Sequence, residues 1–273
     1  MQLIGLGFLH LSGSVLAHDD GSPPWRFEVS APGRSPGDAV TGRLIIAIAK
    51  QARPEPRETI GINGPALIGA DLEQLPPDAS VSVDAGALSY PYTNLRQLPA
   101  GDYFLQAVLV RYRHVRRSDG HVIWVPTAHR RMPFTMLPGN LYSEVRPVHL
   151  DPQTALTLRL ELSQTIAPVE EAKDTEYLRH VTLQSRLLTH FWGTPAFLRA
   201  TVLLPKGFAE HPNVRYPLVF PQSQGPVPFL FNEYPASQEQ DLSNHAANLQ
   251  TGYEFYQSWI SDGFPRLVAV VVE

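Results

Sequence analysis

The chain has 273 residues, of which 43% are hydrophobic and 18% charged, with a formal net charge of −4 and no cysteine. This length suffices for two domains of ~100 to 150 residues that each bury a core. The lack of cysteine excludes disulfides, thiolate metal sites and a cysteine nucleophile, and the small negative charge gives no general attraction to nucleic acid or anionic lipid. The 26 prolines, about twice the usual ~5% share, favour short strands and turns.

The N-terminus has the pattern of an export signal. Leu3 to Leu16 are mostly small or apolar, and Val15-Leu16-Ala17 has the small-x-small form of a signal-peptidase site before polar His18. The sequence therefore predicts a signal peptide over 1–17 and a periplasmic or extracellular protein. The start carries no Lys or Arg and His10 interrupts the apolar stretch, so the alternatives are a misassigned start codon or a buried N-terminal strand in a cytoplasmic protein. No other apolar run approaches the ~18 residues that span a bilayer, so no membrane insertion is expected after signal removal.

Residues 24–166 have the pattern of a β-sandwich. Trp25 to Ser30 alternates apolar and polar residues, and Gly42 to Ala49 is its expected partner strand. Gln51 to Ala79 is rich in Pro and Gly and is expected to be a long excursion with little regular structure, after which Ser80 to Asp84 alternates again.

The later part of this unit contains its clearest strands. Tyr103 to Leu109 is expected to be a strand, and the turn Ser118-Asp119-Gly120 to lead into a hairpin strand, His121 to Pro126, with His114 near Val125. From Leu156 to Ser163 leucines alternate with polar residues, which predicts one buried and one exposed face.

The segment Leu98-Pro99-Ala100-Gly101-Asp102-Tyr103 resembles the corner of immunoglobulin-like sandwiches at which a tyrosine hydroxyl bonds back to the preceding backbone. We therefore expect a mostly β, immunoglobulin-like N-terminal sandwich. Residues 167–176, which include Pro168 and Glu170-Glu171, are expected to form a linker.

From residue 177 the pattern changes to alternating strand and helix. Val181 to His190, Phe197 to Leu204 and Leu218 to Phe220 are expected strands, the last covered on both faces. Leu267 to Val272 is an apolar strand for which we expect at most one edge partner. Between these strands a helix is expected from Asp241, with Gly252 inside it, a cap at Gly263, and an apolar stripe formed by Leu242, Ala246, Leu249, Tyr253, Tyr256 and Ile260.

The stretches Phe197 to Phe208 and His211 to Phe220, with Asn140 to Val145 before them, resemble the esterase D-like bacterial esterases of the α/β-hydrolase family that carry a sandwich in front. Such enzymes show a strand ending in Leu-Pro-x-Gly-Phe/Tyr, here Leu204 to Phe208, followed by Tyr-Pro and an apolar strand that leads to the oxyanion loop. The resemblance implies that residues 177–273 are the N-terminal part of an α/β-hydrolase domain.

This resemblance implies carboxylic-ester hydrolysis in a full-length form, with a small-molecule ester as substrate and no cofactor. The serine, acid and histidine are expected in that order beyond residue 273, so that no catalytic residue lies in this chain and the chain appears truncated and inactive as given. The oxyanion loop falls on Gln222, Ser223 and Gln224, where the family's His-Gly is missing. The alternative is a non-catalytic sandwich that binds a partner and carries a remnant hydrolase segment.

Two other patterns are better explained by structure than by chemistry. Gly33-Arg34-Ser35-Pro36-Gly37 matches the G-x-S-x-G form, but it precedes a strand rather than a helix, and Pro36 lacks the amide that would face an oxyanion. His114, His121 and His129 lie close in sequence without a carboxylate at ligand spacing, and no metal site is expected.

Overall fold

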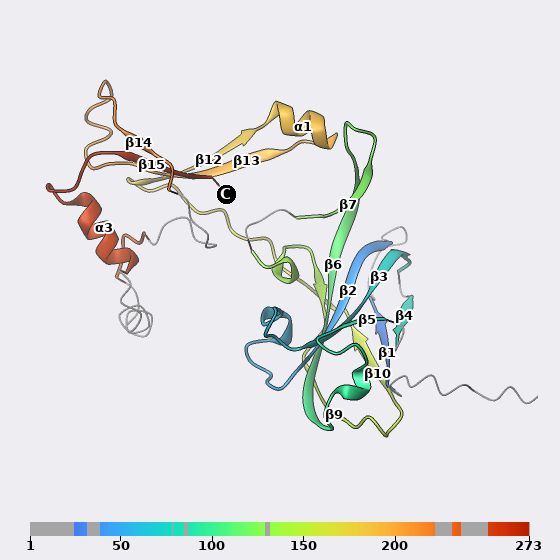
Figure 1. The fold of residues 1–273 in the computed structure, drawn as a ribbon. Helices are drawn as coiled ribbons and strands as arrows, with labels where there is room; N and C mark the ends of the chain where they lie inside the picture. The colour runs from blue at the N-terminus through green and yellow to red at the C-terminus, as the bar shows by residue number, and fades with distance from the viewer. Residues whose placement is uncertain are drawn as a thin grey trace, which may run out of the picture.

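The computed structural model of the chain is mostly β (Figure 1). It describes residues 25–31, 39–77, 79–84, 87–128, 132–221, 231–235 and 251–272. The predicted signal peptide 1–17 therefore lies outside the described residues. Within the described ranges, no helix is long and apolar enough to span a bilayer.

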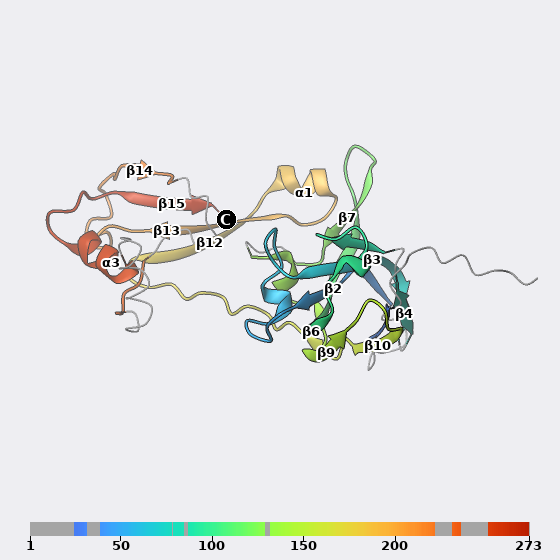
Figure 2. The same ribbon diagram turned by 60° about the horizontal axis from the view of Figure 1, so that its bottom comes forward.

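Two sheets that share one core form the first half of the described chain (Figure 2). In the smaller sheet, β1 (Trp25–Ser30) lies between β10 (Leu156–Glu161) and β4 (Ser80–Val83). The larger sheet has the order β11-β8-β6-β2-β3-β5, with β7 and β9 also paired to β6. Its strands are β2 (Val40–Ala49), β3 (Ala66–Leu75), β5 (Leu88–Tyr90), β6 (Gly101–Arg116), β7 (Val122–Pro126), β8 (Leu141–Tyr142), β9 (Arg146–Leu150) and β11 (Gln164–Thr165).

Alternation along the strands accounts for the core between these sheets. Phe27 and Val29 of β1 and Leu158 and Leu160 of β10 are buried against the larger sheet, as their period of two predicts. The larger sheet contributes Leu44, Ile46 and Ile48 from β2 and Leu105, Ala107 and Leu109 from β6.

The opposite face of β2 and β6 is buried as well. Ile45, Val108 and Val110 form a second cluster there with Tyr142. Pro56–Glu58, a short 3-10 helix, contacts both strands from the stretch that follows β2. Burial on both faces explains why these two strands read as continuous apolar runs.

The expectation of an irregular excursion from Gln51 to Ala79 is wrong, because this stretch contains the ten-residue strand β3. β3 pairs antiparallel with β2, with Ile68 opposite Ile46. Gly69 allows the close approach, since a Cβ there would lie 2.7 Å from the carbonyl oxygen of Leu44. The glycines and prolines around the strand concealed its alternating buried residues, Ala66, Ile68 and Leu72.

The predicted hairpin and tyrosine corner are both present. β7 pairs antiparallel with the end of β6, although His114 lies opposite Trp124, one position from the expected Val125. The Tyr103 hydroxyl donates a hydrogen bond to the Pro99 carbonyl oxygen at 2.7 Å. β6 extends from Gly101 to Arg116, and its far half pairs with β7 as the expected hairpin requires.

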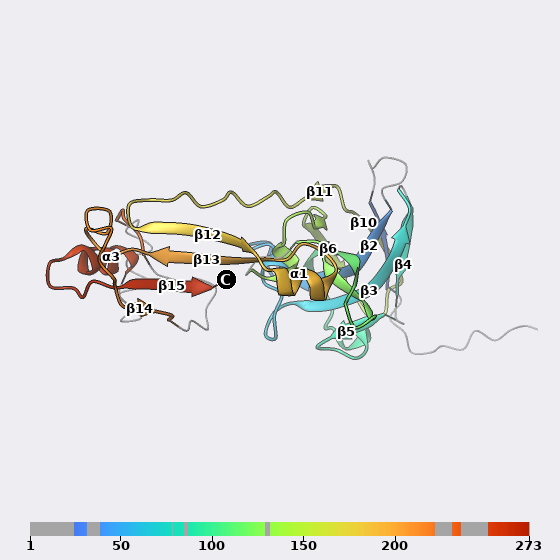
Figure 3. The same ribbon diagram turned by 90° about the horizontal axis from the view of Figure 1, so that it is seen from above.

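The second half is built on a four-stranded sheet with the order β12-β13-β15-β14 (Figure 3). Its strands are β12 (Leu178–Gln184), β13 (Phe197–Leu203), β14 (Leu218–Val219) and β15 (Val268–Val272). β13 runs antiparallel to both its neighbours, whereas β14 and β15 are parallel. The connection between the parallel strands contains α3 (Gly252–Ile260), which gives a strand–helix–strand crossover.

Two expected elements of this half are corrected. The strand expected over Val181 to His190 ends at Gln184, and α1 (Arg186–Trp192) follows, because the Ser185 hydroxyl accepts the Leu188 amide and Gly193 ends the helix in the left-handed region at φ 63°.

Gly252 begins α3 rather than lying inside the helix expected from Asp241. Thr251 has an extended backbone and forms a capping box with Glu254, so that α3 begins at Gly252. α3 also ends at Ile260 with Ser261 as its cap, not at Gly263. Asp241, Leu242, Ala246 and Leu249 lie outside the described residues.

The environments of the two parallel strands also differ from expectation. β15 has partners on both edges, β13 on one side and β14 on the other, rather than at most one. Leu218 and Val219 of β14 are exposed, and not covered on both faces. β14 pairs through only two residues, so it protects little of the edge of β15.

The two halves touch where the hairpin tip meets α1 (Figures 1 and 2). The Ser118 amide donates to the Phe191 carbonyl oxygen at 2.8 Å, and the Arg117 guanidinium lies 4.7 Å from the centroid of the Phe191 ring. Gly193 lies against the Arg116 carbonyl oxygen, which an added Cβ would approach to 2.6 Å. We call these contacts the hairpin–α1 junction.

Candidate functional site

The predicted oxyanion residues Gln222, Ser223 and Gln224 lie outside the described residues. The described chain before them is β14 and the short stretch to Pro221. Ligands of open α/β sheets bind beyond the carboxyl ends of parallel strands, and β14 is parallel to β15. Pro221 is the last described residue after the carboxyl end of β14.

The G-x-S-x-G match and the histidines do not form sites among the described residues. Gly33 to Gly37 lies outside them, but it falls between β1 and β2, so it connects two strands. The His114 ring contacts that of Trp124 at a tilt of 39°, with centroids 3.4 Å apart. His121 Nδ1 lies 3.1 Å from Asp119 Oδ1, and His129 is not described. Within the described ranges, no three His, Asp or Glu side chains are grouped to hold a metal.

The aromatic residues of α3 pack on the sheet and leave no platform for a ligand. Trp259 is buried against Leu203 and Ala269, and its indole nitrogen donates to the Leu204 carbonyl oxygen at 2.7 Å. Phe255 packs in the same cluster, against Trp259 and Phe264.

Tyr177 is the most perturbed titratable group of this cluster. Its ring meets that of Tyr256 edge to face, with centroids 5.8 Å apart. Burial raises the pKa of Tyr177 to about 12, and the Glu176 carboxylate acts in the same direction. The neutral phenol is thereby favoured, which suits a packing role and opposes a role as a base.

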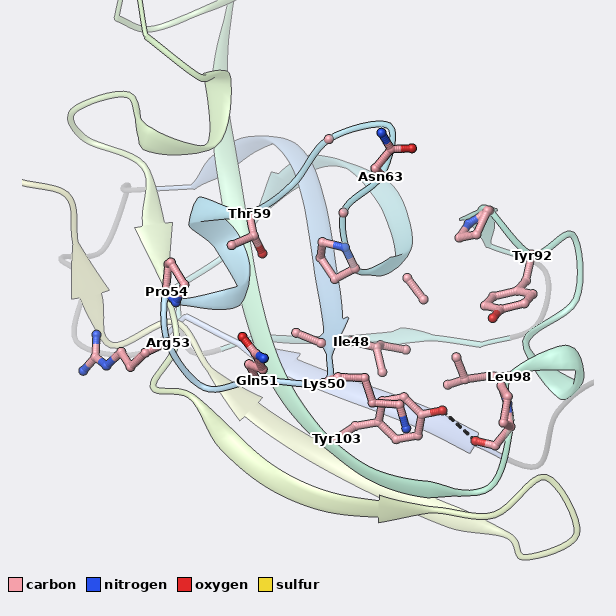
Figure 4. Close-up of a pocket in the computed structure, with 17 residues that line it drawn as sticks. Ile48, Lys50, Gln51, Arg53, Pro54, Thr59, Asn63, Tyr92, Leu98 and Tyr103 are labelled. Carbon is pink, nitrogen blue, oxygen red and sulfur yellow. Dashed lines mark hydrogen bonds between the residues drawn. The ribbon is translucent and has the colours of Figure 1, made fainter. Parts of the chain in front are cut away.

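A cavity among the described residues lies in the sandwich (Figure 4). It has a volume of about 720 Å³, within the range of ~300 to 1,000 Å³ typical of small-molecule sites. Its walls come from the end of β2, the loop that follows, the start of β3, Pro91 and Tyr92 after β5, and the tyrosine corner. We call this cavity the corner pocket.

The strand register places an exposed lysine at the edge of the corner pocket. Ala49 of β2 pairs with Phe104 of β6, so the next residue, Lys50, comes opposite Tyr103. Lys50 Nζ lies 3.4 Å from the centroid of the Tyr103 ring and donates to the Asp102 carbonyl oxygen at 3.4 Å. The Tyr103 ring is held in place by the hydrogen bond from its hydroxyl to Pro99. The Lys50 ammonium group therefore contacts a ring whose position is fixed.

Sequence reasoning missed the corner pocket. Much of its lining lies in the stretch from Gln51 to Ala79, which reads as irregular. Two features of the sequence lie beside this pocket and could have pointed to it: the tyrosine corner at Tyr103 and the expected strand that ends at Ala49. Only the register between β2 and β6 brings Lys50 onto that tyrosine, and register is not visible in a single sequence.

Comparison with known proteins assigns the chain to no family. No family model matches it, and a search of the curated proteins finds no significant match. Its function is therefore argued from the geometry above and from the short motifs of the sequence.

Proposed function

We propose that residues 177–273 are the opening part of the sheet of a serine esterase of the α/β-hydrolase type, preceded by an immunoglobulin-like sandwich and exported from the cytoplasm. The observation that carries this proposal is the four-stranded sheet, with its β14–α3–β15 parallel crossover and its antiparallel β13. A sheet that begins with an antiparallel pair and continues through a parallel crossover suits the resemblance at Phe197 to Phe208. The analogy lies at the level of the fold and of short motifs.

One face of this sheet supports the idea that it belongs to a larger α/β unit. Every buried strand residue of the sheet points toward α3, namely Thr201, Leu203, Ala269 and Val271. The opposite face, which we call the open face, carries Val181, Leu183, Leu198, Val202, Leu218, Val268, Val270 and Val272, none of them buried. Because sheets with parallel strands are usually covered by helices on both faces, this apolar face is suited to a second helical layer.

In the proposed full-length form, ester hydrolysis proceeds by acyl transfer to a serine, with histidine as the base and an acid that orients it. The part supplied by this chain is the loop after β14. Backbone amides near Gln222, Ser223 and Gln224 would face the oxyanion, a contribution of roughly 3 kcal/mol per donor in hydrolases where one has been removed. No nucleophile, base or acid is assigned to a residue of this chain.

Labelling with a serine-directed fluorophosphonate tests the proposal. The 273-residue chain is expected neither to be labelled nor to hydrolyse a p-nitrophenyl ester, whereas a form extended by the reading frame after Glu273 should do both. Ser35→Ala and Ser223→Ala variants serve as controls for the two serines in candidate motifs. Labelling of the 273-residue chain, or a downstream frame without a further G-x-S-x-G, would contradict the proposal.

The second candidate is a binding module formed by residues 24–166, which the corner pocket favours because it lies wholly within the sandwich. This candidate requires that 24–166 fold without the second half. A cooperative thermal transition of the isolated segment, at a temperature close to that of the sandwich in the whole chain, would support it. If the isolated segment remains unfolded, the binding-module candidate is contradicted.

A further inference from the structure

We propose that the corner pocket binds a small organic carboxylate whose apolar, ring-sized body enters the cavity and whose carboxylate pairs with Lys50. This inference specifies the ligand class of the second candidate function and does not depend on the hydrolase proposal. It rests on the lysine held over Tyr103 at the edge of a cavity that is otherwise mainly apolar.

The cavity offers apolar contact on several sides. Ile48, Ala66 and Leu98 line it with side chains that are themselves buried in the core. Four prolines, Pro54, Pro65, Pro91 and Pro99, add rigid walls. Figure 4 shows Tyr92 and Leu98 on one side, Pro54 and Thr59 on the other, and Lys50 between them. A compact apolar group would leave water on entering this space, which is the main driving force for such binding.

The charges of the lining select an anion. The lining residues include Lys50 and Arg53 and no Asp or Glu. Arg53 is neutralised by Glu55, whose carboxylate lies 3.0 Å from Arg53 Nη1. Among the described residues, no carboxylate forms an ion pair with Lys50, whereas Lys206 has Asp262 at 2.9 Å. Within the described part of the chain, the corner pocket therefore presents one ammonium group that no carboxylate pairs with.

One such ammonium group matches a monocarboxylate better than a polyphosphate. A phosphate chain would need several cations that converge on it. The lining holds two, Lys50 and Arg53, and Arg53 is paired with Glu55, which leaves Lys50. Lys50 is pre-positioned by its contact with the Tyr103 ring and by the Asp102 carbonyl oxygen, so little side-chain freedom is lost when a carboxylate binds. The nearby Asp102 carboxylate is engaged with His149 Nδ1 at 2.8 Å.

Isothermal titration of the whole chain with naphthoate and with its neutral isostere naphthamide tests the inference. We expect naphthoate to bind at least about tenfold more tightly, because a charge-assisted hydrogen bond distinguishes the two. Lys50→Met should remove this preference and Lys50→Arg should retain most of it. Lys206→Met, which removes a lysine outside the pocket, should leave the affinity for naphthoate unchanged.

A second variant separates the apolar contact from the charge. Tyr92→Ala should weaken the binding of naphthoate and naphthamide by a similar factor, and thermal melting verifies that each variant is folded. Equal affinity for acid and amide, or a Lys50→Met variant that binds naphthoate as well as the parent, would overturn the assignment of a carboxylate ligand. Failure of both compounds to bind at millimolar concentration would overturn the site itself, and neither result bears on labelling by the fluorophosphonate.

Discussion

Replacement of Gly193 by alanine should open the hairpin–α1 junction. Gly193 has φ 63°, and an added Cβ would lie 2.6 Å from the Arg116 carbonyl oxygen. The left-handed backbone costs a residue with a side chain about 1 kcal/mol or more. The close contact must also displace the hairpin, which would break the bond from the Ser118 amide to Phe191, worth about 1 kcal/mol.

The strain of the backbone and the clash with the hairpin can be measured separately. Gly139 also has a positive φ, 83°, but an added Cβ would meet nothing within 4 Å. Gly139→Ala is therefore a matched control that is expected to cost about 1 kcal/mol, against about 2 kcal/mol or more for Gly193→Ala. Urea unfolding measures both values.

Amide hydrogen exchange reports the junction directly. Exchange of the Ser118 amide should become faster in Gly193→Ala and remain unchanged in Gly139→Ala, because only the first variant displaces the acceptor or the donor of that bond. Equal costs for the two variants, together with unchanged protection of Ser118, would refute the interpretation that Gly193 is required by the junction.

Four further substitutions test the packing of the two cores and the pKa of Tyr177. Tyr103→Phe should lower the free energy of unfolding of the sandwich by about 1 kcal/mol in urea titrations, since it removes the hydrogen bond to Pro99 and leaves the ring under Lys50. Leu203→Ala should lower the free energy of unfolding by about 3 kcal/mol, because Leu203 is buried. Leu198→Ala, on the open face of the same strand, should lower it by under about 1 kcal/mol. Equal losses would show that the open face is covered. Because the folded pKa of Tyr177, about 12, lies above its ordinary value of 10.0, the stability that the neutral phenol contributes is complete below pH 10 and is lost as the pH rises toward 12. Tyr177→Phe should abolish that loss and remove the most alkaline step from the ultraviolet titration of tyrosine.

Strands were predictable from the sequence where one face of the strand is buried and the other is exposed to solvent. Trp25 to Ser30 and Leu156 to Leu162 show this pattern, and their apolar residues lie in the core of the sandwich. β3 was missed because Gly69 and Ala70 interrupt the apolar series where the strand approaches β2 closely. α1 was missed because its leucines and aromatic residues continue the apolar run of β12, and only the Ser185 and Gly193 caps mark its ends.

The candidate site was less accessible to sequence reasoning than the fold. The tyrosine corner was anticipated at Tyr103, yet the pocket beside it depends on which residue of β2 lies opposite that tyrosine. A shift of one residue would place Ala49 there and turn the ammonium group away. The oxyanion loop at Gln222 to Gln224 remains a prediction because it lies outside the described residues.

The pairing of β15 changes where association should occur in the second half. The apolar run of this strand alone suggested an exposed edge, but β13 pairs with Ala269 to Val272 and β14 with Val268 and Ala269. The hydrogen-bonding edge is thus partly protected, whereas the open face presents Leu198 and Leu218 at 42% and 56% exposure. An apolar face can be covered by helices without any change in strand pairing, while an open edge would demand another strand. The open face is therefore suited to helical cover, as the hydrolase proposal requires, whatever pairs with the outer strand edges.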